Sequence, residues 1–373
     1  MDVVTYARRG DTRPTAPADS DRPDPDGARI AWVDAAKGIC IILVVMMHAT
    51  LGVGAEMGRE GFMHWVVAFA KPFRMPDFFL VSGLFLGRVI ARDWRSYADK
   101  RVVHFFYFYL LWLVLQSAAK YGQVSGGSPL GFLEHLAHGL YEPYSTLWFI
   151  YLLAVFSVVT KLLRHVSPNV LLAGAAVLQI LPIETGWLVV DEFCERWVYF
   201  LAGYLLAGRI FALADWASAN PRPALLGIAL WAVVNGVLAF APGPVPAFPT
   251  MAELPLVGLL LGLAGAVAIV AAASLLTRKA AQAAEPLRYC GQNSIAIYLA
   301  FFLPMAATRT ILIKTGIIQD VGIVSLVVLI VAIVAPLVLE RLVRRTPLSF
   351  LFRRPAWAHI VPTRPKVRLQ AAA

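Results

Sequence analysis

Residues 34–48 read Asp34-Ala-Ala-Lys37-Gly-Ile-Cys-Ile-Ile-Leu-Val-Val-Met-Met-His48, an apolar run that begins with charges and ends in an imidazole. Ten residues separate Lys37 from His48, so a helix places both side chains on one face, roughly 16 Å apart along the axis. An ionisable residue inside a membrane-spanning helix is costly and usually faces a bundle interior or a wet cavity. Two interpretations therefore stay open: a functional site, or a core His48 that hydrogen-bonds a neighbouring carbonyl.

The whole chain has the composition of a membrane protein. Of its 373 residues, 59% are hydrophobic and 15% charged, and several runs have the ~20 apolar residues that cross a bilayer. The formal net charge of +10 lies in short loops between these runs, which indicates topology and lipid contact rather than nucleic-acid binding. Cys40, Cys194 and Cys290 are isolated, and His135 and His138 lack a nearby third ligand. We therefore expect an all-α polytopic integral membrane protein without disulfides or a metal site.

About ten membrane-spanning helices are predicted from runs of the expected length. The runs lie at 36–54, 63–91, 101–122, 145–163, 168–187, 193–212, 223–241, 254–276, 289–312 and 321–341. Lys and Arg gather after the even-numbered runs, so the positive-inside rule predicts cytoplasmic N- and C-termini. The corresponding division of the chain is a disordered cytoplasmic leader (1–28), a transmembrane domain (29–345) and a basic cytoplasmic tail (346–373).

A second polar stretch, Lys71-Pro-Phe-Arg74-Met-Pro76-Asp77, lies inside the predicted span 63–91. Arg74 is about eleven residues into this span, or ~16 Å, which is a depth similar to that of His48. Two prolines interrupt the helical hydrogen bonds around Arg74 and free carbonyls that need partners in the protein or in a wet cavity. Asp77, three residues on, pairs with Arg74 or orients His48. The stretch therefore predicts either a site or a kink whose charges neutralise each other.

Arg101 and His104 lie three residues apart at the start of the predicted span 101–122. A guanidinium binds phosphate in a bidentate manner, so this pair is a candidate phosphate contact at the cytoplasmic end. Lys100, beside them, is interpreted as an ordinary cytoplasmic anchor.

The last candidates lie towards the outer ends of later spans or inside an apolar run. Trp148 belongs to an interfacial aromatic belt or stacks on a sugar ring, and Glu195 pairs with the neighbouring arginine or lines an outer pocket. Asn293, Ser294 and Tyr298 either hydrogen-bond between helices or line a cavity.

These motifs together resemble the acyltransferase-3 family of bacterial membrane-bound acyltransferases. Lys37 and His48 match a Lys/Arg-x10-His pattern in that family's first helix, and residues 74–83, Arg-Met-Pro-Asp-Phe-Phe-Leu-Val-Ser-Gly, resemble its second-helix motif. The Leu-Trp-Phe around Trp148 and the Asn-Ser-x-x-x-Tyr of residues 293–298 are similar too. The resemblance covers nearly the whole chain, with one departure: the family often has a second arginine where this chain has His104.

The resemblance implies transfer of an acyl group, acetyl or succinyl, from cytoplasmic acyl-CoA to a hydroxyl of an envelope carbohydrate or glycolipid. The expected residues are His48, Arg74 and Asp77 for catalysis, Lys37, Arg101 and His104 for the acyl donor, and Trp148, Glu195, Asn293, Ser294 and Tyr298 for the acceptor. In these roles the imidazole is general base or covalent relay, and the guanidinium stabilises the oxyanion. The departure at His104 implies a donor contact that is weaker, pH-dependent or shared with Lys100.

The expected surroundings follow from the same resemblance. The protein is expected in the bacterial inner (cytoplasmic) membrane, with acyl-CoA as co-substrate, no permanently bound cofactor, and acyl-CoA, the glycan or glycolipid acceptor and the lipid bilayer as partners. The oligomeric state stays open. A second hypothesis is a proton- or anion-coupled transporter or flippase for an envelope precursor, because a transporter also needs polar groups at mid-membrane. A third is a catalytically inactive membrane partner of an envelope assembly.

Overall fold

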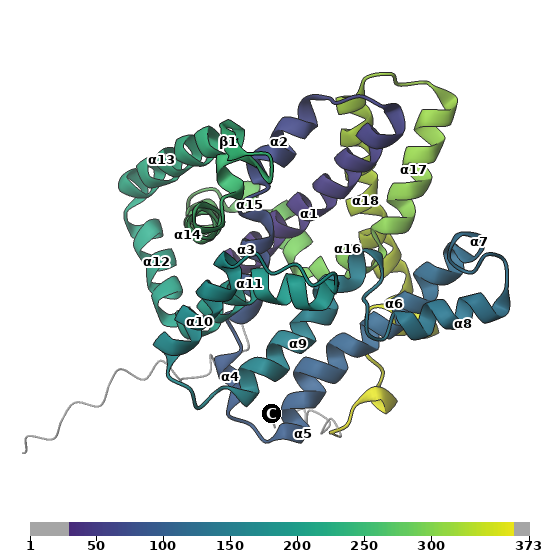
Figure 1. Cartoon of the computed structure of the whole chain (residues 1–373), viewed down its shortest axis with the longest axis horizontal. Helices are drawn as coiled ribbons and strands as arrows, with labels where there is room; N and C mark the ends of the chain where they lie inside the picture. The colour runs from purple at the N-terminus through teal and green to yellow at the C-terminus, as the bar shows by residue number, and fades with distance from the viewer. Residues whose placement is uncertain (1–29, 362–373) are drawn as a thin grey trace, which may run out of the picture. The chain divides into compact units, whose positions relative to one another are not determined.

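A computed structural model of the chain describes residues 30–361 (Figure 1). The predicted leader, 1–28, and residues 362–373 of the predicted tail lie outside this range. Helices make up most of the described part, and two short strands, β1 (Pro242–Val245) and β2 (Phe248–Thr250), pair antiparallel in a hairpin. The hairpin lies between two long helices and adds no sheet core. The predicted all-α class is therefore confirmed for the described residues.

The helices follow one another along the chain with few long loops. The first nine are α1 (Ala31–Met57), α2 (Phe62–Ala70), α3 (Arg74–Gly83), α4 (Gly87–Ile90), α5 (Trp94–Ala98), α6 (His104–Ala119), α7 (Tyr121–Val124), α8 (Pro129–His138) and α9 (Trp148–Leu162). The remainder are α10 (Pro168–Ile180), α11 (Leu188–Leu205), α12 (Ala207–Ala219), α13 (Pro221–Phe240), α14 (Pro255–Lys279), α15 (Ala281–Gln292), α16 (Ser294–Ala300), α17 (Phe302–Thr315) and α18 (Val321–Val343). Short 3-10 turns are η2 (Ser145–Leu147), η3 (Met251–Glu253), η4 (Pro347–Leu351) and η5 (Ala356–Ala358), and η1 (Asp99–Val103) is a π-helical turn that joins α5 to α6.

The described part of the chain contains six helices that are long and apolar enough to cross a membrane, or up to eight if each of two bent pairs is one span. The bent pairs are α11 with α12, at 73°, and α16 with α17, at 53°. The chain is therefore a multi-pass membrane protein, but the predicted count of ten is not confirmed. The two remaining predicted spans correspond to the broken α2–α3 segment and to α10, which has 13 residues. The side on which each terminus lies stays a prediction.

The break between α2 and α3 has a sequence cause. The first helix ends at Ala70, Pro72 follows in the turn, and the second helix starts at Arg74. Pro76 lies in the first turn of α3, where its missing N–H removes no helical hydrogen bond. Arg74 is consequently the first residue of a new helix inside the protein, rather than a residue in the middle of a continuous span.

Helix α1 packs against α3, α14, α15 and α18, so it is surrounded by protein over much of its length (Figure 1). Its contact with α15 is close because both helices carry glycine. A Cβ added at Gly38 would lie 2.0 Å from the Leu287 carbonyl oxygen, and one at Gly291 would lie 1.7 Å from that of Asp34. This packing holds the helix that carries Lys37 and His48 in a defined orientation.

Candidate active site

A cavity of about 210 Å³ lies among α1, α3, α9, α11 and α16. His48, Arg74, Trp148, Arg196 and Tyr298 all line it, and we call it the His48 cavity. Each of these side chains comes from a different helix, so the site exists only in the folded protein. The volume is small for a ligand pocket, so the cavity has room for a small chemical group and not for a large molecule.

His48 faces this cavity without a hydrogen-bond partner from the protein among residues 30–361. Its nearest aromatic neighbour is Phe301, whose ring centroid lies 5.5 Å away at an interplanar angle of 36°. The alternative of a core histidine bonded to a carbonyl does not describe this geometry. Neither ring nitrogen has a hydrogen-bond partner in the described part of the chain, so the lone pair of the neutral imidazole is left for a ligand.

Arg74 carries the clearest sign of a missing ligand. Its Nε and Nη1 atoms are buried and have no hydrogen-bond partner in the described part of the chain. Leaving a buried donor unpaired costs on the order of 1–3 kcal/mol, more for a charged group. A negatively charged or carbonyl oxygen in the cavity would satisfy one of these donors, because guanidinium N–H groups only donate hydrogen bonds and form strong ones with anionic acceptors.

Asp77, the third predicted catalytic residue, lies outside the His48 cavity. It is 1% exposed, it is not among the residues that line the His48 cavity, and neither carboxylate oxygen has a hydrogen-bond partner among the described residues. The predicted contact with Arg74 or His48 is therefore absent from residues 30–361. The reason is geometric: Arg74 extends a long side chain from the helix start, whereas the short Asp77 side chain stays in the first turn of α3, where the helix dipole favours a carboxylate.

A second cavity, of about 170 Å³, contains Lys37, Ser82, Arg101 and Ser294 in its lining, and we call it the Lys37 cavity. Two cations from distant segments, α1 and η1, thus meet at one site. Both cavities have three lining side chains in common: Phe78, Phe149 and Tyr298. These aromatic residues form the wall between the two cavities.

The third cavity is the largest of the three, at about 530 Å³. Gln179, Glu195, Tyr199 and Glu253 line it, and we call it the Gln179 cavity. Three further residues, Arg74, Met75 and Arg196, line both this cavity and the His48 cavity. The three cavities therefore form a series in which the His48 cavity lies between the other two.

The predicted acceptor residues are divided among these places. Trp148 and Tyr298 line the His48 cavity, whereas Glu195 lines the Gln179 cavity. Ser294 lies on the Lys37 cavity, and Asn293 lines none of the three but donates a hydrogen bond to the Tyr289 carbonyl over 2.9 Å. The helix is interrupted at Asn293, between α15 and α16, so the side chains of Asn293 and Ser294 point in different directions.

The predicted donor residues are divided as well. Lys37 and Arg101 line the Lys37 cavity, but His104 is not among its lining residues. The imidazole of His104 packs instead edge-on against Phe108, with 5.2 Å between ring centroids. The candidate donor site thus contains two of the three predicted side chains.

Sequence reasoning missed the ion pair between Arg196 and Glu192, which fixes Arg196 at the boundary of two cavities. Arg196 also contacts Glu195 over 3.2 Å and lies 5.5 Å from the ring centroid of Trp148. The signal was present, because residues four apart on a helix are neighbours on one face. The sequence predicted only the adjacent Glu195 as a partner of Arg196.

The fold and the site define a multi-pass helical membrane protein whose buried histidine and arginine share a cavity at the junction of two others. The chain matches the acyltransferase-3 family, described as an acyltransferase domain, over residues 30–341, and it belongs to this family. It is similar to the inner membrane protein YcfT of Escherichia coli (strain K12), with 26% identity over 160 residues that cover 36% of this chain and 44% of that protein. The alignment therefore spans less than half of that relative. No solved structure matches the chain.

Proposed function

We propose that the protein transfers an acetyl or succinyl group from acyl-CoA to a hydroxyl of an envelope carbohydrate or glycolipid in a bacterial inner membrane. The observation that carries the proposal is the shared cavity of His48 and Arg74, which provides a free imidazole and a guanidinium with unpaired donors. Family membership supports acyl transfer as the reaction class.

The donor enters through the Lys37 cavity. Lys37 and Arg101 provide two positive charges for the phosphates of CoA, and a guanidinium pairs with phosphate through two hydrogen bonds. Aromatic side chains form the wall that separates this cavity from the His48 cavity, and the methylene groups of a pantetheine arm can pack against them. An acyl thioester passing that wall reaches His48 and Arg74.

The reaction proceeds at the His48 cavity. The acceptor hydroxyl attacks the thioester carbonyl while His48 takes its proton, and Arg74 donates hydrogen bonds to the developing oxyanion. The C–O bond forms, the C–S bond breaks, and the CoA thiolate leaves with the proton from His48. In the alternative sequence, the imidazole attacks the thioester carbonyl, the C–S bond breaks and CoA leaves as the thiolate. The acyl group then passes from the imidazole to the hydroxyl, whose proton is released to the imidazole.

The acceptor enters through the Gln179 cavity, whose larger volume and polar side chains suit a hydroxyl-rich molecule. The Oε1 atom of Gln179 is buried without a hydrogen-bond partner among the described residues and is available to accept from a sugar hydroxyl. Glu195 and Tyr199 offer further hydrogen-bonding groups at the same cavity. Trp148 supplies an aromatic face in the adjoining His48 cavity.

Transport is the second candidate function, and the arrangement of three cavities in series favours it specifically. A carrier for an anionic envelope precursor would use Lys37, Arg74 and Arg196 as successive binding groups. Such a protein would move its substrate without consuming acyl-CoA, so the two functions differ in one measurable reaction.

The test uses membranes containing the protein, labelled acetyl-CoA or succinyl-CoA, and envelope glycan. The wild type should acylate the glycan, and His48→Ala should lower the rate by about 10²–10⁴-fold, because that is the usual contribution of a general acid–base residue. His165→Ala, at an exposed histidine, is the matched control and should keep the wild-type rate. A His48→Ala variant as active as the wild type would refute the mechanism, and a wild type that consumes no acyl-CoA would favour transport.

A further inference from the structure

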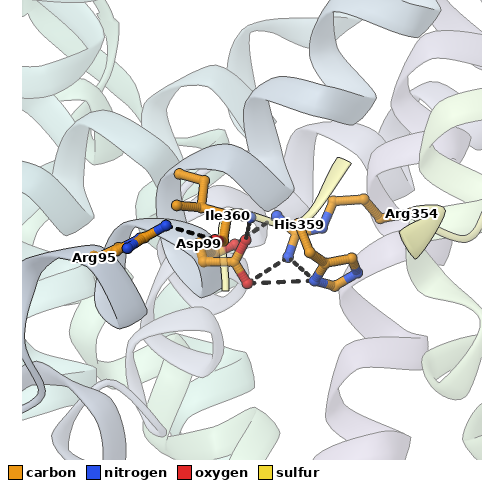
Figure 2. A network of polar contacts seen from close by, with 5 residues as sticks. All are labelled: Arg95, Asp99, Arg354, His359 and Ile360. Carbon is orange, nitrogen blue, oxygen red and sulfur yellow. Dashed lines mark hydrogen bonds and ion pairs between the residues drawn. The ribbon is translucent and has the colours of Figure 1, made fainter. Parts of the chain in front are cut away.

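Residues 354–360, near the C-terminus, contact Asp99, the first residue of η1 (Figure 2). The Asp99 carboxylate accepts hydrogen bonds from the Ile360 backbone N–H over 2.7 Å and from Arg354 Nη2 over 2.9 Å. Arg354 Nη1 donates to the Asp99 carbonyl oxygen over 2.6 Å. The Arg354 guanidinium therefore hydrogen-bonds both the side chain and the backbone of Asp99.

This ion pair is buried, since only 4% of the Arg354 side chain and 6% of the Asp99 side chain are exposed. His359 also belongs to this network, because its Nδ1 accepts a hydrogen bond from Arg354 Nη2 over 2.7 Å (Figure 2). Removing one member of a buried pair strands the other charge, so such a pair resists opening. These contacts consequently hold residues 354–360 firmly against η1.

Residues 347–361 attach along the following helix as well, and we call them the C-terminal strap. Tyr107 donates a hydrogen bond to the Phe350 carbonyl over 3.0 Å, and Trp112 Nε1 donates to the Leu351 carbonyl over 3.0 Å. At the far end, Arg95 donates to the Ile360 carbonyl over 3.4 Å (Figure 2). The strap therefore spans α5, η1 and α6 with contacts on both sides of Asp99.

The turn that the strap holds also carries Arg101. Asp99 and Arg101 are two residues apart, so they point to nearly opposite sides of a helix. Asp99 faces the strap, and Arg101 lines the Lys37 cavity. A π-helical turn is less regular than an α-helix and depends on its surroundings for its conformation. The orientation of Arg101 thus depends on contacts made on the other side of the turn.

We infer that Arg354 and Asp99 are positioning residues: the C-terminal strap locks the turn Asp99–Val103 so that Arg101 points into the Lys37 cavity. The inference rests on the proposed function for the identity of the molecule that Arg101 binds, the phosphates of acyl-CoA. The strap itself touches neither the His48 cavity nor the Gln179 cavity, so its loss should affect donor binding and spare the acceptor.

The first measurement is hydrogen–deuterium exchange of the full-length protein in lipid nanodiscs, without substrate. Arg354→Ala should raise exchange about tenfold or more in peptides covering residues 99–103, because the turn loses a buried charged partner. Arg353→Ala is the matched control, since that neighbouring side chain is 58% exposed and lies 3.9 Å from Glu340. Its exchange at residues 99–103 should equal that of the wild type.

The second measurement is the dependence of acyl transfer on each substrate. Arg354→Ala should raise the KM for acetyl-CoA about tenfold, with kcat at saturating donor and the acceptor KM both within about twofold of the wild type. Arg101→Ala should add little to this defect when combined with Arg354→Ala, because residues that act as one unit are non-additive. A merely structural role would change kcat and both KM values together.

Two conservative variants keep the test decisive if Arg354→Ala does not fold. Arg354→Lys retains the charge but loses the fork, and Asp99→Asn retains the shape but loses the charge, so both should give the same pattern with smaller changes. Unchanged exchange at residues 99–103 in folded variants, or an unchanged donor KM alongside faster exchange, would overturn the inference. A wild type without acyl-transfer activity would contradict the proposed function alone, and exchange would then decide whether the strap locks the turn.

Discussion

At the scale of single residues, Arg74 distinguishes the His48 cavity from an ordinary gap between helices. It lines two of the three cavities, and two of its buried donors lack partners in the described part of the chain. Arg196 lines the same two cavities, but its Nε and Nη2 atoms are paired with Glu192 and Glu195. The two arginines therefore differ in their surroundings: acids hold Arg196 in place, whereas two donors of Arg74 have no partner among the described residues.

A prediction at this scale concerns the shape of the Arg74 head group. Arg74→Lys keeps a positive charge but replaces the planar fork by a point charge, so it should lower kcat by about 10²–10³-fold, as loss of an oxyanion donor does. Substrate KM values should change little, because the interaction is strongest in the transition state. Steady-state kinetics of acyl transfer test this, with Arg209→Lys on an exposed position of α12 as the control. A wild-type kcat in Arg74→Lys would rule out oxyanion stabilisation by its guanidinium.

At the scale of elements, the crossing of α3 and α11 sets the place of Arg74 relative to Arg196. Both helices present glycine at the contact: a Cβ at Gly83 would lie 2.2 Å from the Phe200 carbonyl oxygen, and one at Gly203 would lie 2.0 Å from that of Leu80. Small residues that allow backbones to approach closely are typical of helix packing in membranes. The close crossing brings the two arginines to one boundary.

We expect Gly203→Ala to destabilise the protein, since its methyl group would overlap a backbone oxygen and force the two helices apart. Overpacking of this kind costs about 1–3 kcal/mol, so the thermal unfolding midpoint in detergent should fall by several degrees. Gly174→Ala on α10 is the control, because no atom lies within 4 Å of the added Cβ. That variant should unfold at the wild-type temperature or slightly above it, as alanine is the better helix former. Equal midpoints for the two variants would show that the crossing tolerates a side chain.

At the scale of the whole molecule, the helices and their connections decide the topology, and loop charge is an imperfect guide to it. Lys161 lies at the end of the fourth predicted span, 145–163, and counts towards the positive side, yet it is 1% exposed. Its ammonium donates hydrogen bonds to the carbonyls of Ile90 over 2.8 Å and Arg92 over 2.7 Å. This lysine therefore stabilises the fold and reports nothing about the membrane side.

Both termini are nevertheless predicted on the cytoplasmic side, which requires an even number of membrane crossings. Fusions of green fluorescent protein to either end should fluoresce, and alkaline phosphatase fused at either end should be inactive, because these reporters work on opposite sides of the bacterial inner membrane. A phosphatase inserted at Gly58, in the turn between α1 and α2, should be active and serves as the control. Phosphatase activity at one terminus would mean an odd number of crossings.

The amino-acid sequence by itself determined the class of protein and the types of residue in the site. Apolar runs of membrane-spanning length allow only helices, since the bilayer core leaves no water for unpaired backbone groups. Ionisable side chains are also costly inside such runs, so the sequence identifies His48 and Arg74 as candidate functional residues. The motifs around them also led to the acyltransferase-3 family, which the match over residues 30–341 confirms.

Only the tertiary structure decided which of these side chains meet. Spacing along a helix gives the direction of a side chain but not the helix that faces it, so Asp77, His104 and Asn293 lie outside the cavities to which their patterns assigned them. The structure also brings Arg354 onto Asp99, a contact between residues 255 positions apart that no local pattern encodes. Such contacts depend on how helices pack through glycines and breaks, and that packing is a property of the whole chain.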